Sequence, residues 1–205
     1  MPRRALPDVE ADRELTLHVA VDVASVIGLE GLTIGRLADR LGMSKSGLAG
    51  RFGSKLSLQL ATLELAAEMF RASVYEPALA HPAGRARLSA ICNRWIDYIG
   101  EPCFPGGCFL TSASVEFDHR GGPVRDAVEQ QASRWLRALA AEAAVAVSAG
   151  ELSDRTDPDE VAFALNALAI GTNCDYQLRH DSASLARGRR AMEAVLGAPV
   201  APPRG

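Results

Sequence analysis

The sequence is poor in aromatic side chains, which make up 5% of its residues, although 48% of all residues are hydrophobic. Alanine and leucine dominate the apolar set instead. Both are strong helix formers, whereas sheets favour aromatic and β-branched residues. A chain of 205 residues is long enough to bury a sizeable core. The composition therefore favours a helical protein over one built on sheets.

Long hydrophobic runs are also missing from the sequence. The longest apolar segment, Val161 to Ile170, is much shorter than the ~20 residues that a helix needs to span a bilayer. Residues 1–12 lack the apolar run of a signal peptide. We therefore expect a cytoplasmic protein.

Cysteine and histidine are scarce, with four residues of each type. Cys103 and Cys108 lie close together in sequence, but no further pair of Cys or His stands nearby at the spacing of a zinc finger. We therefore expect free, mostly buried thiols, with neither a metal nor a cofactor.

The stretch from Thr33 to Lys55 has the pattern of two short helices joined by a tight turn. Apolar residues recur at i, i+3, i+4 and i+7 and so share one buried face: Ile34, Leu37, Ala38 and Leu41. Gly42 can adopt the positive φ that ends a helix, and Ser44 can cap a second helix over residues 45–52. We interpret this segment as a helix-turn-helix, which places its second helix in a DNA major groove.

Positive charge gathers in this segment, although the chain as a whole has a formal charge of -3. Over residues 31–55, five basic residues stand against the single acid Asp39, a local charge of +4: Arg36, Arg40, Lys45, Arg51 and Lys55. The second helix also has a face of small and polar groups, which lets a backbone approach base edges: Lys45, Ser46, Gly47 and Ala49. Both features fit a polyanionic partner.

Over roughly residues 10–60 the sequence resembles the N-terminal DNA-binding domain of the TetR family of bacterial transcription regulators. The resemblance rests on the type and spacing of these residues: Thr33, Ile34, Leu37, Ala38, Gly42, Met43, Ser44, Lys45, Leu48, Phe52, Ser54 and Lys55. Two positions depart from it, because Ala49 and Arg51 stand where the family commonly has aromatic residues. The first of those aromatics usually touches the DNA backbone, and we expect Arg51 to supply part of that contact.

The resemblance implies a DNA-binding surface around the second helix. We expect Lys45, Ser46 and Gly47 to approach base edges, which specify the sequence, while other residues contact phosphates and position the helix. The phosphate contacts are expected at Thr33, Arg51 and Lys55. The complete predicted DNA-binding set is Thr33, Ser44, Lys45, Ser46, Gly47, Ala49, Arg51 and Lys55. An αα-hairpin with a solvated basic face is the alternative.

Helical periodicity and capping signals continue through the rest of the chain. They predict further helices over residues 9–27, 55–79, 84–99, 108–117, 123–148, 158–179 and 184–196. The predicted fold is all-α, with an N-terminal three-helix helix-turn-helix domain followed by a larger helical domain for ligand binding and dimerisation. The expected domain boundaries are residues 1–54 and 55–205.

Most of the large side chains lie in the middle of the sequence, among helices and a loop rich in glycine and proline at residues 100–107. Short segments at residues 106–110, 116–118 and 122–126 resemble the ligand-binding half of one TetR subgroup. The resemblance implies a cavity for a small apolar or amphipathic ligand. The predicted lining residues are Met69, Phe70, Trp95, Tyr98, Phe104, Phe109, Phe117 and Trp135. For each of them, a place in the core is the alternative.

The segment that starts at Val161 is apolar nearly all round, so both of its sides need cover. Paired with the last helix, and with the same pair in a second subunit, it would form a four-helix bundle. The predicted dimer contacts are Phe163, Ala164, Ala167, Leu168 and Gly171. A central helix of a monomer is the alternative.

The resemblance, together with these patterns, leads us to expect a ligand-responsive repressor that binds a palindromic DNA operator as a homodimer. The sequence has neither paired carboxylates, nor a nucleophile motif, nor metal-ligand spacing, so we do not expect an enzyme. Two alternatives stay open. One is a helical carrier or enzyme with a structural N-terminal hairpin, and the other is a regulator that senses thiol oxidation through Cys103 and Cys108.

Overall fold

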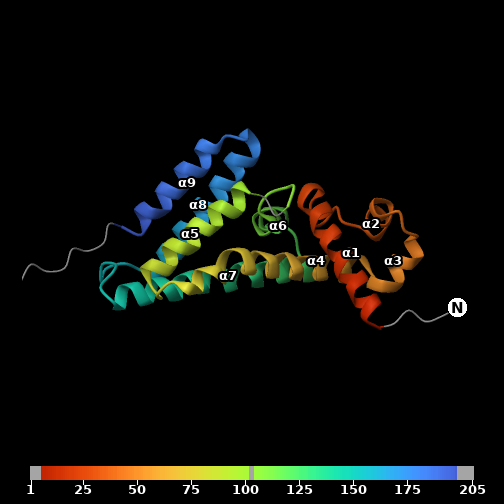
Figure 1. The fold of residues 1–205 in the computed structure, drawn as a ribbon, viewed down its shortest axis with the longest axis horizontal. Helices are drawn as coiled ribbons and strands as arrows, with labels where there is room; N and C mark the ends of the chain where they lie inside the picture. Colours follow the sequence, from red (N-terminus) through yellow and green to blue (C-terminus); the bar gives the residue numbers. More distant parts are fainter. Residues whose placement is uncertain (1–5, 102–103, 198–205) are drawn as a thin grey trace, which may run out of the picture. The chain divides into compact units, whose positions relative to one another are not determined.

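The computed structural model describes residues 6–101 and 104–197, and its regular elements in these ranges are all helical (Figure 1). The α-helices are α1 (Leu6–Ile27), α2 (Ile34–Leu41), α3 (Lys45–Phe52), α4 (Lys55–Phe70), α5 (Arg85–Gly100), α6 (Phe109–Phe117), α7 (Pro123–Ser148), α8 (Pro158–Arg179) and α9 (Ser182–Val195). The predicted all-α fold is confirmed. Within the described ranges, none of the helices is long and apolar enough to cross a membrane.

The chain divides into two compact units that are not continuous in sequence. The first comprises residues 1–69 and 104–129, and the second comprises residues 70–103 and 130–205. Helix α6 and the start of α7 therefore join the N-terminal helices in the first unit. The functional division expected at residue 54 stays a prediction.

The first unit contains the helix-turn-helix, with both of its short helices at the predicted bounds. Gly42 ends α2 in the left-handed conformation with a φ of 64°. The hydroxyl of Ser44 then accepts a hydrogen bond from the backbone N–H of Gly47 at 3.1 Å and caps α3. Thr33 caps α2 in the same way, through the N–H of Arg36 at 3.2 Å. The turn thus sets the direction in which α3 leaves α2.

A small apolar core holds these helices together, and α2 contacts both α1 and α3. Leu37 of α2 and Leu48 of α3 are fully buried, and Phe52 is 5% exposed. Helix α1 contributes four buried apolar residues to this unit: Leu17, Ala20, Val21 and Ala24. Burial of one leucine side chain stabilises a fold by roughly 1.5–3 kcal/mol, so this core fixes the position of α3.

The prediction of one long helix over residues 55–79 is wrong. The α-helix begins as expected, with Ser54 accepting the N–H of Ser57 at 3.0 Å, but it ends at Phe70. A π-helical turn follows over Arg71–Tyr75, closed by the bond from the N–H of Glu76 to the carbonyl of Arg71 at 2.9 Å. A 3₁₀ turn then covers Pro77–Ala80. Proline lacks an N–H and cannot continue the α-helical ladder, which accounts for the change of winding ahead of it.

The second unit contains α8 and α9, which lie side by side, and α5, which packs against both (Figure 1). Asp157 caps α8 through the N–H of Asp159 at 2.9 Å, as predicted. Helix α9 begins at Ser182 rather than at residue 184, because Asp181 caps it through the N–H of Ala183 at 2.9 Å. The two helices meet closely at Gly188, where a Cβ atom would lie 2.3 Å from the Thr172 hydroxyl oxygen.

Candidate functional site: an exposed helix and an aromatic cluster

Helix α3 divides into a buried face and an exposed face. Leu48 and Phe52 point into the core of the first unit. The exposed side chains and glycines are Lys45, Ser46, Gly47 and Gly50. Ala49, which was predicted to contact DNA, is half-buried. The exposed face therefore consists of small groups and one lysine, the surface that a helix needs for deep entry into a groove.

Sequence reasoning missed Gly50, which lies one turn beyond Ser46 on the exposed face of α3. A Cβ atom at this position would meet nothing within 4 Å. Neither packing in the first unit nor a positive φ therefore calls for glycine here. Glycine in a helix interior costs roughly 0.5–1 kcal/mol relative to alanine. The signal in the sequence was this costly residue in the middle of a short helix.

All three predicted phosphate contacts have hydrogen-bond or ion-pair partners inside the first unit. The guanidinium of Arg51 donates to the hydroxyl of Thr16 at 3.2 Å. The ammonium of Lys55 lies 2.7 Å from a carboxylate oxygen of Glu30. The third residue, Thr33, has its hydroxyl at the N-terminus of α2. Lys45 differs from them because it is exposed. Its side chain passes close to Gly35, where an added Cβ atom would lie 3.4 Å from the Cε of Lys45.

Glu30 connects the turn after α1 with the start of α4. Its carboxylate accepts from Lys55 and, at 3.2 Å, from the amide of Gln59. Gln59 also donates to the carbonyl of Leu29 at 2.8 Å. The hydrogen bond from Lys55 and then that from Gln59 lower the pKa of Glu30 below its ordinary value of 4.5. The carboxylate is therefore ionised at neutral pH, and the pair ties the turn to α4.

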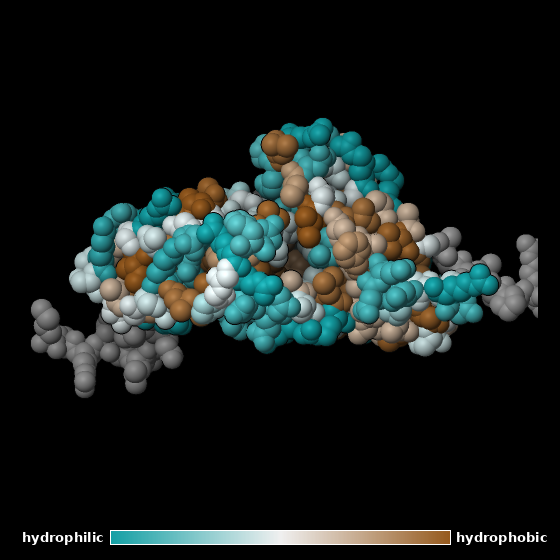
Figure 2. All heavy atoms as spheres, turned by 180° about the vertical axis from the view of Figure 1, so that it is seen from behind, coloured by the Kyte–Doolittle hydropathy of each residue, from teal (hydrophilic) through white to brown (hydrophobic). Residues whose placement is uncertain are grey.

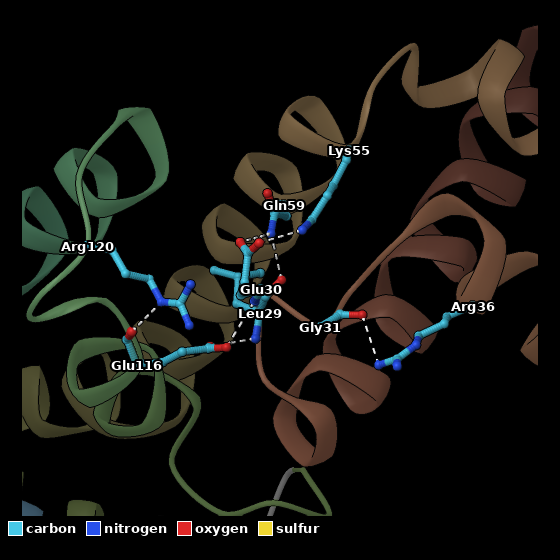
Figure 3. A network of polar contacts seen from close by, with 8 residues as sticks. All are labelled: Leu29, Glu30, Gly31, Arg36, Lys55, Gln59, Glu116 and Arg120. Atoms are coloured by element: carbon cyan, nitrogen blue, oxygen red, sulfur yellow. Dashed lines mark hydrogen bonds and ion pairs between the residues drawn. The ribbon is translucent and has the colours of Figure 1, made fainter.

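Glu116 of α6 binds the same turn from a second direction (Figure 3). One oxygen of its carboxylate accepts the N–H of Leu29 at 2.7 Å, and the other accepts the N–H of Glu30 at 3.1 Å. The backbone carbonyl of Glu116 accepts from Arg120 at 2.8 Å. Hydrogen bonds to an ionised acceptor are stronger than those between neutral groups. Glu116 therefore links α6 to the segment that leads into the helix-turn-helix.

The close approach of Glu116 depends on Gly28 at the end of α1. Gly28 has a φ of +82°, which L side chains rarely adopt. A Cβ atom there would lie 2.4 Å from a carboxylate oxygen of Glu116. Both the backbone conformation and the space around it thus call for glycine at this position.

Four of the eight predicted ligand-binding residues form an aromatic cluster in the second unit: Phe70, Trp95, Tyr98 and Trp135. The ring centroid of Phe70 lies 5.6 Å from that of Trp95, 5.3 Å from that of Tyr98 and 4.9 Å from that of Trp135. The two tryptophan rings lie 5.0 Å apart. All of these contacts are edge to face, the arrangement that aromatic pairs prefer. Tyr75, which was not predicted, joins at 6.4 Å from Trp135.

The other four predicted ligand-binding residues belong to the first unit. Phe104 and Phe109 are buried with their ring centroids 6.2 Å apart. Phe117 is buried beneath the guanidinium of Arg120, which lies 5.6 Å from its ring centroid. Met69 is half-buried at the end of α4. The sequence grouped these side chains by their position along the chain, whereas the fold distributes them between two units.

A surface hollow of about 420 Å³ lies against α5 in the second unit. Its lining includes His81, Arg85 and Arg94, but none of the predicted ligand-binding aromatics. The hollow and the aromatic cluster are therefore separate features of this unit.

Helix α8 exposes a row of apolar and small residues on one face: Phe163, Ala167, Gly171, Cys174 and Leu178. Phe163 is 71% exposed and Leu178 is 81% exposed, which is unusual for large apolar side chains. Figure 2 shows hydrophobic side chains on the surface of the helical hairpin made by α8 and α9. Three predicted dimer contacts lie in this row, while Ala164 and Leu168 are half-buried. Cys174 and Leu178 extend the row beyond the predicted set.

The described cysteines lie in different environments. Cys92 and Cys108 are buried, and Cys174 is exposed. Burial first, and then the nearby carboxylate of Glu193, raise the pKa of Cys92 to about 12. The thiol of Cys92 is therefore protonated and unreactive at neutral pH. Cys103, one of the two residues of the thiol-sensing alternative, lies outside the described residues.

Residues 84–192 match the family described as "Tetracyclin repressor-like, C-terminal domain". The chain belongs to the TetR family of transcription regulators. The family match lies in the C-terminal part, and the helix-turn-helix described above supplies the DNA-binding part of such a regulator. The predicted family is thus confirmed by residues other than those that first indicated it.

Individual proteins are similar to this chain in sequence or in fold. The chain is 25% identical over 107 residues to the uncharacterized HTH-type transcriptional regulator YezE of Bacillus subtilis, and this match covers 52% of the chain and 55% of YezE. It therefore spans about half the length of this relative. A TetR regulator from Chloroflexus aurantiacus has a TM-score of 0.87 at 21% identity, with 95% of this chain and 98% of that one covered.

AibR, solved with isovaleryl coenzyme A and operator DNA, has a TM-score of 0.70 at 17% identity, and the match covers 91% of this chain and 98% of AibR. These structural likenesses show a shared fold. The family match, together with the helix-turn-helix, supports a DNA-binding transcription regulator.

Proposed function

We propose that this TetR-family regulator is a ligand-responsive repressor that binds a palindromic operator as a homodimer. The observation that carries the proposal is the exposed face of α3, which presents Lys45, Ser46 and two glycines beyond a firmly capped turn. Bulky side chains would hold the helix axis away from base edges, and this face has none. Lys45 and Ser46 are the proposed base-edge contacts, with the backbone at Gly47 and Gly50 close to the groove floor.

A dimer is proposed because one helix of eight residues offers few base contacts, and a two-fold axis doubles them. The exposed row on α8 fits the predicted four-helix bundle, since it presents Phe163 and Leu178 fully outward over small residues. Small residues allow two helices to approach closely. In this arrangement each subunit supplies the same row, as a two-fold interface requires.

The ligand response is proposed to start at the aromatic cluster of the second unit, which offers a largely apolar environment for an organic molecule. AibR, whose structure contains both isovaleryl coenzyme A and operator DNA, is an example of this fold with both kinds of partner. A ligand can release DNA only if it binds the non-binding conformation more tightly than the DNA-binding one.

Within the first unit, Glu116 is the proposed connection between α6 and the helix-turn-helix. Its two hydrogen bonds to the turn after α1 make the position of that turn depend on α6. Glu30 and Lys55 do the same for α4. A displacement of either helix would then change the direction of α3, and with it the fit to DNA.

The proposal is tested by selecting bound sequences from a random duplex pool with the purified protein. We expect one inverted repeat to be recovered, and an affinity for it well above that for random DNA at the same salt concentration. Recovery of a single, unrepeated half-site would contradict the homodimer. Weak binding without any recovered motif would contradict the regulator itself and favour a helical carrier or enzyme.

A further inference from the structure

The aromatic cluster contains two buried polar atoms that lack a hydrogen-bond partner among the described residues. The indole N–H groups of Trp95 and Trp135 are buried, and neither donates to a hydrogen-bond acceptor among the described residues. Trp95 as a whole is only 3% exposed. An indole nitrogen is a donor only, so it cannot be satisfied by another donor. Buried tryptophan normally finds an acceptor, and leaving a donor unpaired costs about 1–3 kcal/mol.

Both donors belong to the same small group of rings. The centroids of the two tryptophans lie 5.0 Å apart, and Phe70 contacts both of them edge to face. A molecule bound between these rings would meet apolar ring faces, and the rings around it carry the two unpaired N–H donors. The apolar contacts accept any small organic molecule, whereas the donors distinguish molecules by the presence of an acceptor atom.

The surroundings determine which acceptor is favourable. Among the described residues, Glu142 is the one charged side chain that is buried, and Arg87 pairs with it at 2.8 Å. A buried carboxylate or phosphate would find no buried cation as a partner, and an unpaired buried charge is costly. A neutral oxygen has no such requirement. The two donors therefore fit a carbonyl oxygen in an otherwise apolar molecule.

We infer that the ligand of this regulator is a neutral, mainly apolar carbonyl compound whose oxygen accepts hydrogen bonds from Trp95 and Trp135. This inference rests on the proposed ligand response and names the chemical class of the ligand that causes it. Binding converts two unpaired donors into hydrogen-bonded ones, which a hydrocarbon of the same shape cannot do.

The test compares ketones with alkenes in which the oxygen is replaced by a methylene group. Suitable pairs of increasing size are cyclohexanone with methylenecyclohexane, acetophenone with α-methylstyrene, and benzophenone with 1,1-diphenylethylene. The chain contains two tryptophans in total, so its tryptophan fluorescence reports on this cluster alone. In at least one pair, we expect the ketone to bind about tenfold more tightly than the alkene, since one satisfied donor corresponds to roughly that ratio.

The hydrogen bonds are observed directly in the ¹⁵N–¹H spectrum of the full-length protein, where each indole N–H gives one signal. We expect the bound ketone to move both signals to higher proton frequency, and the alkene to leave them without this shift. Trp95→Phe and Trp135→Phe keep an aromatic ring but remove one donor each, so each variant should lose the part of the preference for the ketone that its donor supplies. Thermal-shift titration then measures affinity independently of fluorescence.

Phe70→Leu is the matched control, because it changes the apolar wall between the tryptophans without removing a donor. It should weaken ketone and alkene binding equally and leave their ratio unchanged. Equal affinity of ketone and alkene in all pairs, or absence of binding by every ketone, would overturn the inference. If both members of a pair released the selected operator, the proposal of a ligand-responsive repressor would stand independently of the preference for a carbonyl group. Preferential binding of ketones without release of DNA would instead contradict the ligand response.

Discussion

At the residue scale, the two lysines of this regulator have different surroundings. Lys45 is exposed on α3, whereas the ammonium of Lys55 lies 2.7 Å from the carboxylate of Glu30. An exposed lysine is available to a phosphate or a base edge, and a paired one must first leave its partner. Lys45 is therefore placed where it is available to DNA, whereas Lys55, ten positions later, stabilises the fold.

The Lys55–Glu30 pair makes a prediction about pH. The pKa of Glu30 is lowered in the folded state, so the pair contributes stability above the ordinary value of 4.5 and loses it as the pH falls through the folded pKa. Glu30→Gln should reduce the free energy of unfolding at neutral pH by about 0.2–1 kcal/mol, since both side chains are more than a third exposed. In urea titrations this difference should vanish well below pH 4.5. Glu68→Gln, at an exposed position of α4, is the control, and a pH-independent loss in Glu30→Gln would contradict the assignment.

The exposure of Lys45 follows from its place at the start of a helix, but the partner of Lys55 could not be read from the sequence. Lys45 stands three residues before Leu48 and seven before Phe52, so helical periodicity alone would put it on their buried face. Its position as the first residue of α3 leaves it exposed instead. Glu30 stands 25 residues before Lys55 and meets it only because the turn after α1 packs beside α4. Local patterns carry no information about such a pairing, and the same holds for Arg51 and Thr16.

At the element scale, α3 is held in a fixed position and has an exposed face on which most side chains are small. The capped turn and the buried Leu48 hold the helix, while Gly47 and Gly50 leave its outer surface open. Stability and the proposed contact with DNA consequently place opposite demands on this helix. Glycine weakens a helix in the free protein, but it allows the backbone to approach base edges.

Gly50→Leu separates these two demands. Leucine is a much better helix former than glycine, and space is open at this position, so we expect the free protein to gain about 0.5–1 kcal/mol in denaturant unfolding. The same side chain would hold α3 away from the groove and lower operator affinity at least tenfold. Ala144→Leu, at an exposed position of α7, should change neither quantity appreciably. Unchanged operator affinity of the stabilised Gly50→Leu protein would show that this face does not meet DNA.

Glu116 makes a second prediction at this scale, for the connection between α6 and the turn after α1. Glu116→Ala leaves the N–H groups of Leu29 and Glu30 without their acceptor, and Leu29 is 1% exposed. The free energy of unfolding should fall by about 1–3 kcal/mol. Asp118→Ala removes an exposed carboxylate two residues away and should cost little. Equal effects of the two substitutions in urea titrations would contradict the structural role of Glu116.

Helix bounds were predictable wherever a cap or a glycine marks them. The ends of α2, α3 and α8 follow from Gly42, Ser44 and Asp157. The end of α4 did not follow, because the effect of Pro77 reaches back through a π-helical turn to Phe70. Winding of that kind depends on how the segment packs and leaves no periodic signal in the sequence.

At the scale of the whole molecule, the exposed row on α8 is the feature on which the proposed second subunit rests. Phe163 and Leu178 are largely exposed in one chain, and an interface between two chains would remove both from water. The aromatic cluster in the same unit shows the opposite arrangement, with its large side chains packed against one another. The sequence predicted four of the clustered aromatics and three residues of the α8 row, but it missed Tyr75, Cys174 and Leu178. It also could not divide the predicted aromatics between the two units, because that division depends on tertiary packing.

Phe163→Asp tests the dimer. A charge at this position would have to be buried in a two-fold interface opposite its own copy, so we expect the variant to be monomeric in sedimentation equilibrium where the parent is dimeric. Its circular dichroism should stay helical, since Phe163 is 71% exposed within one chain. Val115→Asp, at a 56% exposed position of α6, should remain dimeric. A dimeric Phe163→Asp protein, or a monomeric parent, would contradict this interface.

The account as a whole depends on α3 being the helix that reads DNA. The most direct measurement is the affinity of Lys45→Ala and of Lys55→Ala for the selected inverted repeat, each over a series of salt concentrations. We expect Lys45→Ala to bind more weakly and to lower the salt slope by about one for each subunit, because a cation that meets DNA is lost. Lys55→Ala, which removes a cation paired to Glu30, should leave the slope close to that of the parent. Parental affinity and slope in Lys45→Ala would contradict the account.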